Sequence, residues 1–149
     1  MQYWKPIRAF MRRVSKLAIK TCDIVIFHKA AHRISAFYDA QLAPSGLCLS
    51  EFATLVRLSR EKQVKLEAFF ENSSLGKRAV NRHLRHLTEI GLIRIEMPKA
   101  DGRGVVTLTR QGLAVLKKAV PLWQMAQARF EALNGAALRE TLNGLVLEG

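Results

Sequence analysis

The stretch from residue 76 to residue 90 constrains the fold more than any other part of the chain. At roughly 100° per residue, its apolar side chains share one face of a helix and are predicted to pack inward: Val80, Leu84 and Leu87. Its arginines fall on the opposite face, with Asn81 at the edge: Arg78, Arg82 and Arg85. Such a helix covers a core with one side and leaves a strongly cationic side in water.

The residues after Gly91 change from helical to alternating periodicity, and glycine is favoured where a helix ends in a left-handed turn. Residues 92–97 partly alternate in polarity, and residues 105–108 are rich in β-branched side chains. Both segments are therefore predicted to be strands. The segment 98–104 between them holds turn-forming and basic residues. We expect a β-hairpin with a basic tip directly after the helix.

Most of the remaining chain has helical periodicity. Helices are predicted over residues 4–20 (basic and amphipathic), 23–42, a short segment capped by Ser50, 65–71, 110–133 capped by Thr109, and a last segment through Leu138, Leu142, Leu145 and Val146. Residues 43–46 and 134–135 hold the Pro, Gly and Asn residues that interrupt helices.

Three helices followed by a hairpin, with long helices on either side, are typical of a winged helix-turn-helix. We therefore predict a mainly α fold with a small β-hairpin wing. The winged-helix core is expected at about 47–110, with flanking helices at about 21–43 and 110–147. Residues 1–20 would be a basic N-terminal extension of a single domain at 21–149.

The chain of 149 residues carries a formal charge of +12, from 24 Lys and Arg against 12 Asp and Glu. A surface of this charge attracts polyanions such as DNA and RNA, and also anionic membranes. Two cysteines do not make a secreted disulfide framework. No apolar run approaches the roughly 20 residues that span a bilayer. We expect a cytoplasmic protein without a membrane span.

The arginine face and the hairpin indicate the same partner. Arginine reaches phosphates and guanine edges in the major groove, and the amide of Asn81 suits adenine. Lys99, Arg103 and Arg94 could enter a neighbouring minor groove. Asp101 would start the turn or pair with Arg103. A solvated charged face is the simpler interpretation of the helix alone, but the short helix before it and the basic hairpin after it favour DNA.

Three motifs in order along the chain resemble the MarR family of transcriptional regulators. They are Leu84…Leu87-Thr88-Glu89-Ile90-Gly91-Leu92-Ile93-Arg94, the wing motif Asp101-Gly102-Arg103, and the helix start Leu108-Thr109-Arg110-Gln111-Gly112. The similarity runs from about residue 22 to residue 147. It implies an obligate homodimer that binds pseudo-palindromic operators in double-stranded DNA, usually as a repressor. It also implies DNA contacts from Lys77, Arg78, Asn81, Arg82 and Arg103, to which the charge pattern adds Arg85 and Lys99.

Some positions depart from the family pattern. Gly76 stands where a capping Asp or Ser is frequent, Ala79 and Asn81 stand where Thr or Ser is usual, and Gly104 loosens the wing. These departures leave the operator sequence open.

The first and last helices are more apolar than one small core can bury, and MarR-like proteins interlace such helices from two chains. A homodimer would place two recognition helices about one DNA turn apart. A ligand or an oxidation that favours another spacing would lower operator affinity.

The resemblance also implies a pocket for small anionic aromatic effectors, for which His32, Arg33 and Phe52 are candidates. Cys22 is the candidate redox sensor, with Cys48 the second thiol, although both fit the pattern of small buried residues. His28 and His32 are spaced i, i+4, but two histidines without a third ligand are better explained as ordinary polar positions, so no metal or cofactor is expected. No ordered catalytic constellation is present, and we do not expect an enzyme.

Two other functions stay open. The first is a sequence-independent nucleic-acid-binding or architectural protein, in which the charge supplies most of the affinity. The second is a membrane-surface or protein-docking module that uses residues 1–20. That segment has two further interpretations, as an extension of the dimer interface or as a grip on flanking DNA.

Overall fold

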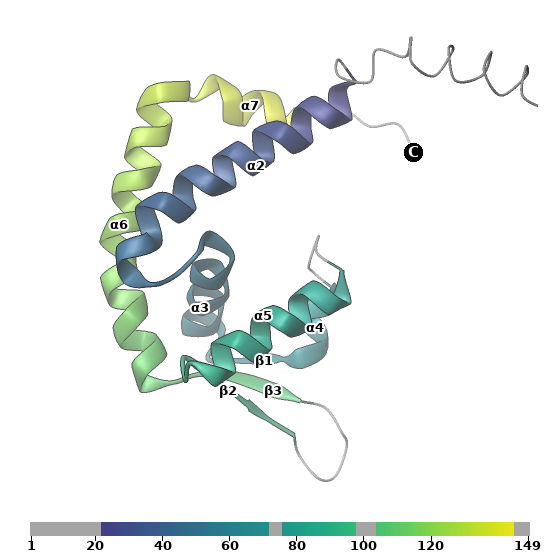
Figure 1. The fold of residues 1–149 in the computed structure, drawn as a ribbon, viewed down its shortest axis with the longest axis vertical. Helices are drawn as coiled ribbons and strands as arrows, with labels where there is room; N and C mark the ends of the chain where they lie inside the picture. Colours follow the sequence, from purple (N-terminus) through teal and green to yellow (C-terminus); the bar gives the residue numbers. More distant parts are fainter. Residues whose placement is uncertain (1–21, 72–75, 98–103, 145–149) are drawn as a thin grey trace, which may run out of the picture. The chain divides into compact units, whose positions relative to one another are not determined.

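The computed structural model describes residues 22–71, 76–97 and 104–144. The elements in order are α2 (Asp23–Leu42), the 3-10 turn η2 (Ala43–Ser45), α3 (Leu49–Glu61), β1 (Gln63–Lys65), α4 (Leu66–Glu71), α5 (Lys77–Glu89), β2 (Ile93–Glu96), β3 (Val105–Leu108), α6 (Arg110–Asn134) and α7 (Ala137–Asn143) (Figure 1). The part of α2 up to Ala36 belongs to one compact unit, and the chain from Phe37 onward forms a second unit. The predicted helix over residues 4–20 and the wing tip lie outside the described residues.

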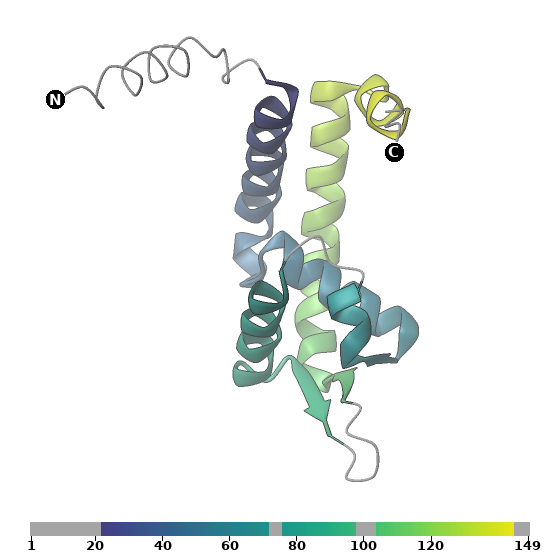
Figure 2. The ribbon, with the colours of Figure 1, turned by 90° about the vertical axis from the view of Figure 1, so that its right-hand side faces the viewer.

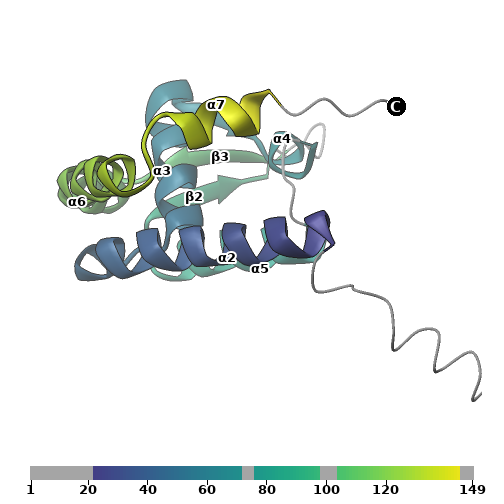
Figure 3. The same cartoon turned by 90° about the horizontal axis from the view of Figure 1, so that it is seen from above.

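The core of the second unit forms around α3, which lies between α6 and the sheet (Figures 1 and 3). The largest fully buried side chains come from α2, α3, α5 and β3: Leu42, Leu55, Leu58, Leu84, Leu87 and Val106. These residues belong to one continuous apolar cluster. The helix-turn-helix and the wing therefore share a core, as the predicted mainly α fold with a small β-wing requires.

The hairpin prediction is confirmed, but the sheet has a third strand that the sequence analysis missed. Both β2 and β1 pair antiparallel with β3, which gives the order β1-β3-β2. Lys65, which was predicted to begin a helix, ends β1 instead, and α4 starts at the next residue. A three-residue strand has little periodicity of its own, and only its pairing with β3, some forty residues later in the chain, makes it a strand.

The start of α3 also differs from the prediction. The N-cap is Cys48 rather than Ser50. Two carboxylates satisfy the first free backbone amides of this helix: the Leu49 N–H donates to Asp39 Oδ1 (2.7 Å) and the Cys48 N–H donates to Glu51 Oε2 (2.9 Å). Acidic groups are favourable at a helix N-terminus, so these contacts move the start of α3 ahead of the serine.

The segment between α5 and α6 connects α5, the sheet and α6 through hydrogen bonds to one carbonyl group. The Thr109 N–H donates to Leu92 O (3.1 Å), and the Thr109 hydroxyl lies 2.7 Å from Gly91 O and 3.1 Å from Leu92 O. The same hydroxyl oxygen accepts the N–H of Gly112 (2.9 Å), which confirms Thr109 as the N-cap of α6. Gly91 has φ +75°, the left-handed conformation predicted for the end of α5.

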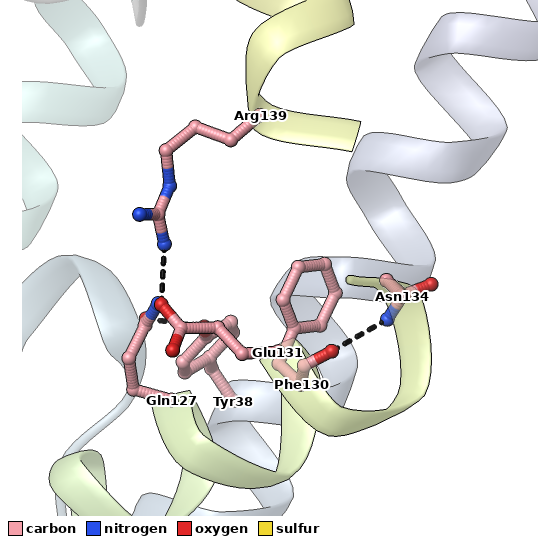
Figure 4. A network of polar contacts seen from close by, with 6 residues as sticks. All are labelled: Tyr38, Gln127, Phe130, Glu131, Asn134 and Arg139. Carbon is pink, nitrogen blue, oxygen red and sulfur yellow. Dashed lines mark hydrogen bonds and ion pairs between the residues drawn. The ribbon is translucent and has the colours of Figure 1, made fainter. Parts of the chain in front are cut away.

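The far end of α6 is held by polar contacts and by aromatic rings that pack at tilted angles. Tyr38 Oη donates to Gln127 Oε1 (2.7 Å), Gln127 Nε2 donates to Glu131 Oε1 (2.8 Å), and Arg139 of α7 pairs with the same carboxylate (Figure 4). The ring of Tyr38 lies 5.8 Å from that of Phe130. The predicted interruption at residues 134–135 is confirmed, and α7 leaves the direction of α6 there (Figure 2). Leu145 and Val146 of the predicted last helix lie outside the described residues.

Gly112→Ala is expected to destabilise the fold by about 2–3 kcal/mol. A Cβ at this position would collide with the carbonyl oxygen of Leu92 and would lie 2.8 Å from Cδ1 of Leu108. Urea unfolding measures the change. Gly76→Ala is the control, because its Cβ would meet nothing within 4 Å. A more stable Gly112→Ala protein, as helix propensity alone would give, would contradict the close packing.

Candidate nucleic-acid interface

Helix α5 has the two faces that its sequence predicts. Val80, Leu84 and Leu87 are buried in the apolar cluster. The helix begins after Gly76, which has extended backbone angles and supplies no side-chain cap. Burial of this apolar stripe fixes the rotation of the helix about its axis, so the opposite face is held toward solvent.

The five predicted DNA-contact residues of α5 are all exposed, and the three arginines lie opposite the buried stripe: Lys77, Arg78, Asn81, Arg82 and Arg85. Arg85 is near Glu89, with 3.5 Å between Nε and Oε1, and both side chains are largely in water. The side chains of the other four make no hydrogen bond or ion pair within the described part of the chain. An exposed ion pair contributes little stability, so this face is not held together by internal contacts.

A groove of about 810 Å³ runs between α5 and the base of the wing. Arg78, Asn81, Arg82 and Arg85 form its polar wall. Its apolar wall includes Leu66 from α4 and Ile95 from β2, two residues that the sequence analysis did not connect with the site. Leu66 and Ile95 lie beside the arginines of α5 only in the folded chain. No sequence motif connects either residue with those arginines.

The wing is described at its base only. Arg94 is exposed on β2 and lies near Glu96, with 3.8 Å between Nη1 and Oε1. Gly104 lies where β3 meets α4: its carbonyl accepts the Leu66 N–H (2.8 Å), and a Cβ there would lie 2.8 Å from Met97 Sδ. This glycine therefore permits close packing at the base of the wing. Lys99, Asp101 and Arg103 lie outside the described residues.

A polar cluster connects α3 with the inner edge of α5. Glu51 is buried, and its Oε1 lies 3.5 Å from Nε2 of His86. Nε2 of His83 lies 3.3 Å from Oγ1 of Thr54. Burial lowers the pKa of His83 below its ordinary value, although the negative charge of Glu51 acts in the opposite direction. The sequence analysis missed Glu51, because a lone glutamate in an amphipathic helix gives no local sign of burial.

Comparison with known proteins finds transcriptional regulators that are similar to this chain in sequence and in fold. No protein-family model matches the chain. HTH-type transcriptional repressors of Mycobacterium tuberculosis and Mycobacterium bovis are 33% identical to this chain over 92 residues. The matched residues make up 61% of this chain and 66%, just under two thirds, of each repressor. The Mycobacterium tuberculosis transcriptional regulator MosR, in a crystal structure with DNA, is 29% identical, covering 82% of this chain and 92% of MosR with a TM-score of 0.71.

The apo form of MarR from Escherichia coli has the same fold, with 18% identity, coverage of 79% of this chain and 89% of MarR, and a TM-score of 0.64. The chain therefore has the fold of the solved MarR-family regulators.

The candidate effector residues of this chain lie on two helices. Phe52 is buried on α3 and stacks on Trp123 of α6, with ring centroids 5.8 Å apart. Both rings line a groove of about 570 Å³. His32 and Arg33 are exposed on the part of α2 that precedes residue 37. Effector binding by these residues stays a prediction.

The redox role considered for the cysteines also stays a prediction. Cys22 is exposed, and Cys48 is half-buried at the start of α3, where its Sγ lies 3.2 Å from Oγ of Ser50. His28 is exposed on α2. Among the described residues, no group of three or more His, Cys, Asp or Glu side chains is arranged to hold a metal ion.

The lowered pKa of His83 predicts a pH-dependent stability. The unfolded chain binds the His83 proton near the ordinary pKa of 6.5, whereas the folded chain binds it only at lower pH. The stabilising contribution is therefore complete above pH 6.5 and is lost as the pH falls through the folded pKa. Urea unfolding at pH 7.5 and pH 5, at one protein concentration, should show a smaller loss for His83→Gln than for the wild type.

His32→Gln is the control for that experiment, because His32 is exposed. It should lose as much stability as the wild type. An equal loss in His83→Gln and the wild type would show that burial of His83 has no effect on stability.

Proposed function

We propose that this chain is a sequence-specific repressor that binds double-stranded DNA as a homodimer at a pseudo-palindromic operator. The observation that carries the proposal is the exposed cationic face of α5, which is held toward solvent by the buried stripe of the same helix and borders the groove beside the wing. The protein would act by binding rather than by catalysis, and in the cytoplasm.

The chemistry of this face fits a major-groove reader. Arg78, Arg82 and Arg85 offer bidentate donors for guanine edges and phosphates, and Asn81 offers the donor and acceptor that adenine pairs with. The groove wall formed by these residues also faces the base of the wing. Lys99 and Arg103 of the wing would extend the contact to a neighbouring minor groove. The similarity to MosR, which was crystallised with DNA, supports the same assignment.

Selection of bound duplexes from a random DNA pool tests the proposal. The wild type is expected to enrich two half-sites with twofold symmetry, about one helical turn apart. The double variant Arg78→Ala, Arg82→Ala should bind the enriched duplex about 100-fold more weakly or worse, because each base or phosphate contact contributes about 1–3 kcal/mol. Titration at constant salt measures the loss.

Lys117→Ala with Lys118→Ala is the matched control, because it removes the same charge from exposed positions on α6. It should bind the enriched duplex nearly as well as the wild type. Equal weakening by both double variants, or no enriched motif, would instead support the sequence-independent binding protein, whose affinity depends on total charge.

The dimer part of the proposal rests on apolar side chains that the second unit leaves in water. Met125 and Leu133 of α6 are 68% and 69% exposed, and Leu142 of α7 is also exposed. Large apolar side chains clustered at one end of a helix pair are typical of a surface that another chain covers. A twofold dimer through these helices would carry two copies of α5, as a pseudo-palindrome requires.

Leu133→Glu is expected to dissociate the dimer, because it places a charge in an apolar interface. Light scattering should give about 34 kDa for the wild type, twice the chain mass of 16.8 kDa, and a mass nearer one chain for the variant. Leu113→Glu, at the opposite end of the same helix, should stay dimeric. A wild type that scatters as a single chain would overturn the dimer.

Relief of repression is part of the same proposal. A small anionic aromatic compound held near Phe52, with His32 and Arg33 as further candidates, would favour a dimer whose recognition helices no longer fit the operator. Oxidation of Cys22 is the alternative signal.

A further inference from the structure

Glu51 is the one charged side chain that is buried within the described residues, with 8% of its surface exposed. Its two carboxylate oxygens have different partners. Oε2 accepts the N–H of Cys48 at 2.9 Å, and Oε1 lies 3.5 Å from Nε2 of His86. One carboxylate therefore caps α3 and lies within ion-pair distance of α5.

A second contact between the same helices involves His83. The Thr54 hydroxyl donates its hydrogen to Ser50 O at 2.9 Å, so its oxygen is left to accept from Nε2 of His83 at 3.3 Å. Burial keeps the pKa of His83 below its ordinary value, so this ring stays neutral near pH 7 and serves as a donor.

The two histidines occupy one border of α5. At roughly 100° per residue they lie between the buried stripe and the arginine face, and His86 is next to Arg82 on that border. The side chain of His86 is 55% exposed. It therefore has a buried carboxylate on one side and, on the other, the surface where phosphates would bind.

We propose that operator binding by this chain takes up a proton at His86, with Glu51 as the positioning residue, so that the affinity for DNA rises as the pH falls from 8 to 6. This inference rests on the proposed function, since it concerns the same helix. It adds a regulatory input, proton concentration, at a place separate from the candidate effector residues.

The physical argument is one of linkage. An imidazolium at His86 faces the Glu51 carboxylate and adds positive charge at the edge of the phosphate-binding surface. DNA therefore binds the protonated form more tightly than the neutral form, and binding raises proton affinity by the same factor. For one proton the gain is at most about tenfold per pH unit.

The other charged groups around this border are mostly paired with one another or lie at its edges. Arg85 is near Glu89 on α5, and Arg94 is near Glu96 on β2. On the side of α3, Asp39 of α2 accepts the Leu49 N–H. Three further charged groups on α5 and α4 are exposed: Arg82, Glu67 and Glu71. The Cys48 thiol at the start of α3 is half-buried. The charges that act on His83 are those of Glu51 and His86.

The test is titration of the enriched operator duplex with full-length protein at pH 8 and pH 6, at constant ionic strength. The wild type should bind about three- to tenfold more tightly at pH 6. His86→Gln should lose most of that ratio, and Glu51→Gln should reduce it. His28 and His32 remain in every protein, so comparison of the ratios removes their contribution.

Glu96→Gln is the matched control. It removes an exposed acid that lies near Arg94 on β2 rather than on the helix that carries the histidines. It should strengthen binding at both pH values and leave the ratio unchanged. Glutamine at position 51 can still accept the Cys48 N–H, so this variant is expected to fold, and urea unfolding checks that.

An unchanged ratio in His86→Gln overturns the inference, whatever Glu51→Gln does. A reduced ratio in His86→Gln with an unchanged one in Glu51→Gln overturns the positioning role of Glu51. Failure of the proposed function looks different, because the wild type would then bind no duplex selectively at either pH.

Discussion

The contact on which the structure depends is the one at the Leu92 carbonyl. This oxygen accepts the Thr109 N–H and lies against the backbone of Gly112, so the end of α5, the start of β2 and the first turn of α6 meet within a few ångströms. A side chain at position 112 would push them apart. Because α6 also carries the apolar residues proposed for the dimer contact, this contact relates α5, the helix proposed to bind DNA, to the helix that would position the partner copy.

The contact at the Leu92 carbonyl also affects how α5 exposes its cationic face. The rotation of α5 about its axis is set by the burial of Val80, Leu84 and Leu87, and the contact at Leu92 fixes the position of the helix end. The arginines themselves need no internal partner to be held toward solvent. A cationic face that is oriented by apolar packing keeps its charges available for a ligand, whereas one oriented by ion pairs would have to break them on binding.

The contact between α3 and α5 adds a polar connection to this apolar framework. A buried carboxylate is costly unless its oxygens are satisfied. Glu51 meets that requirement with the backbone amide of Cys48 at the start of its own helix and with His86 of α5. The arrangement places a titratable ring between the core and the proposed DNA surface, where proton binding and DNA binding can influence one another.

Sequence periodicity was enough to predict most of the fold. The apolar stripe of α5, the left-handed Gly91, the hairpin strands, the Thr109 cap and the break at residues 134–135 all follow from local patterns. Local patterns work here because each of these features is set by the preference of a few consecutive residues. The family motifs have the same local character, and the resemblance that they carry agrees with the fold of the solved MarR-family regulators.

Only the tertiary structure decided the features that depend on distant partners. Gln63–Lys65 is a strand because β3 pairs with it, and α3 begins at Leu49 because Asp39 and Glu51 satisfy its first amides. Glu51 is buried because α5 packs beside it, and Leu66 and Ile95 line the groove because three elements meet there. The sequence determined which residues α5 turns toward solvent, since helical spacing is local. The chain's folding decided what lies around that face, because contacts between distant segments are absent from any local pattern.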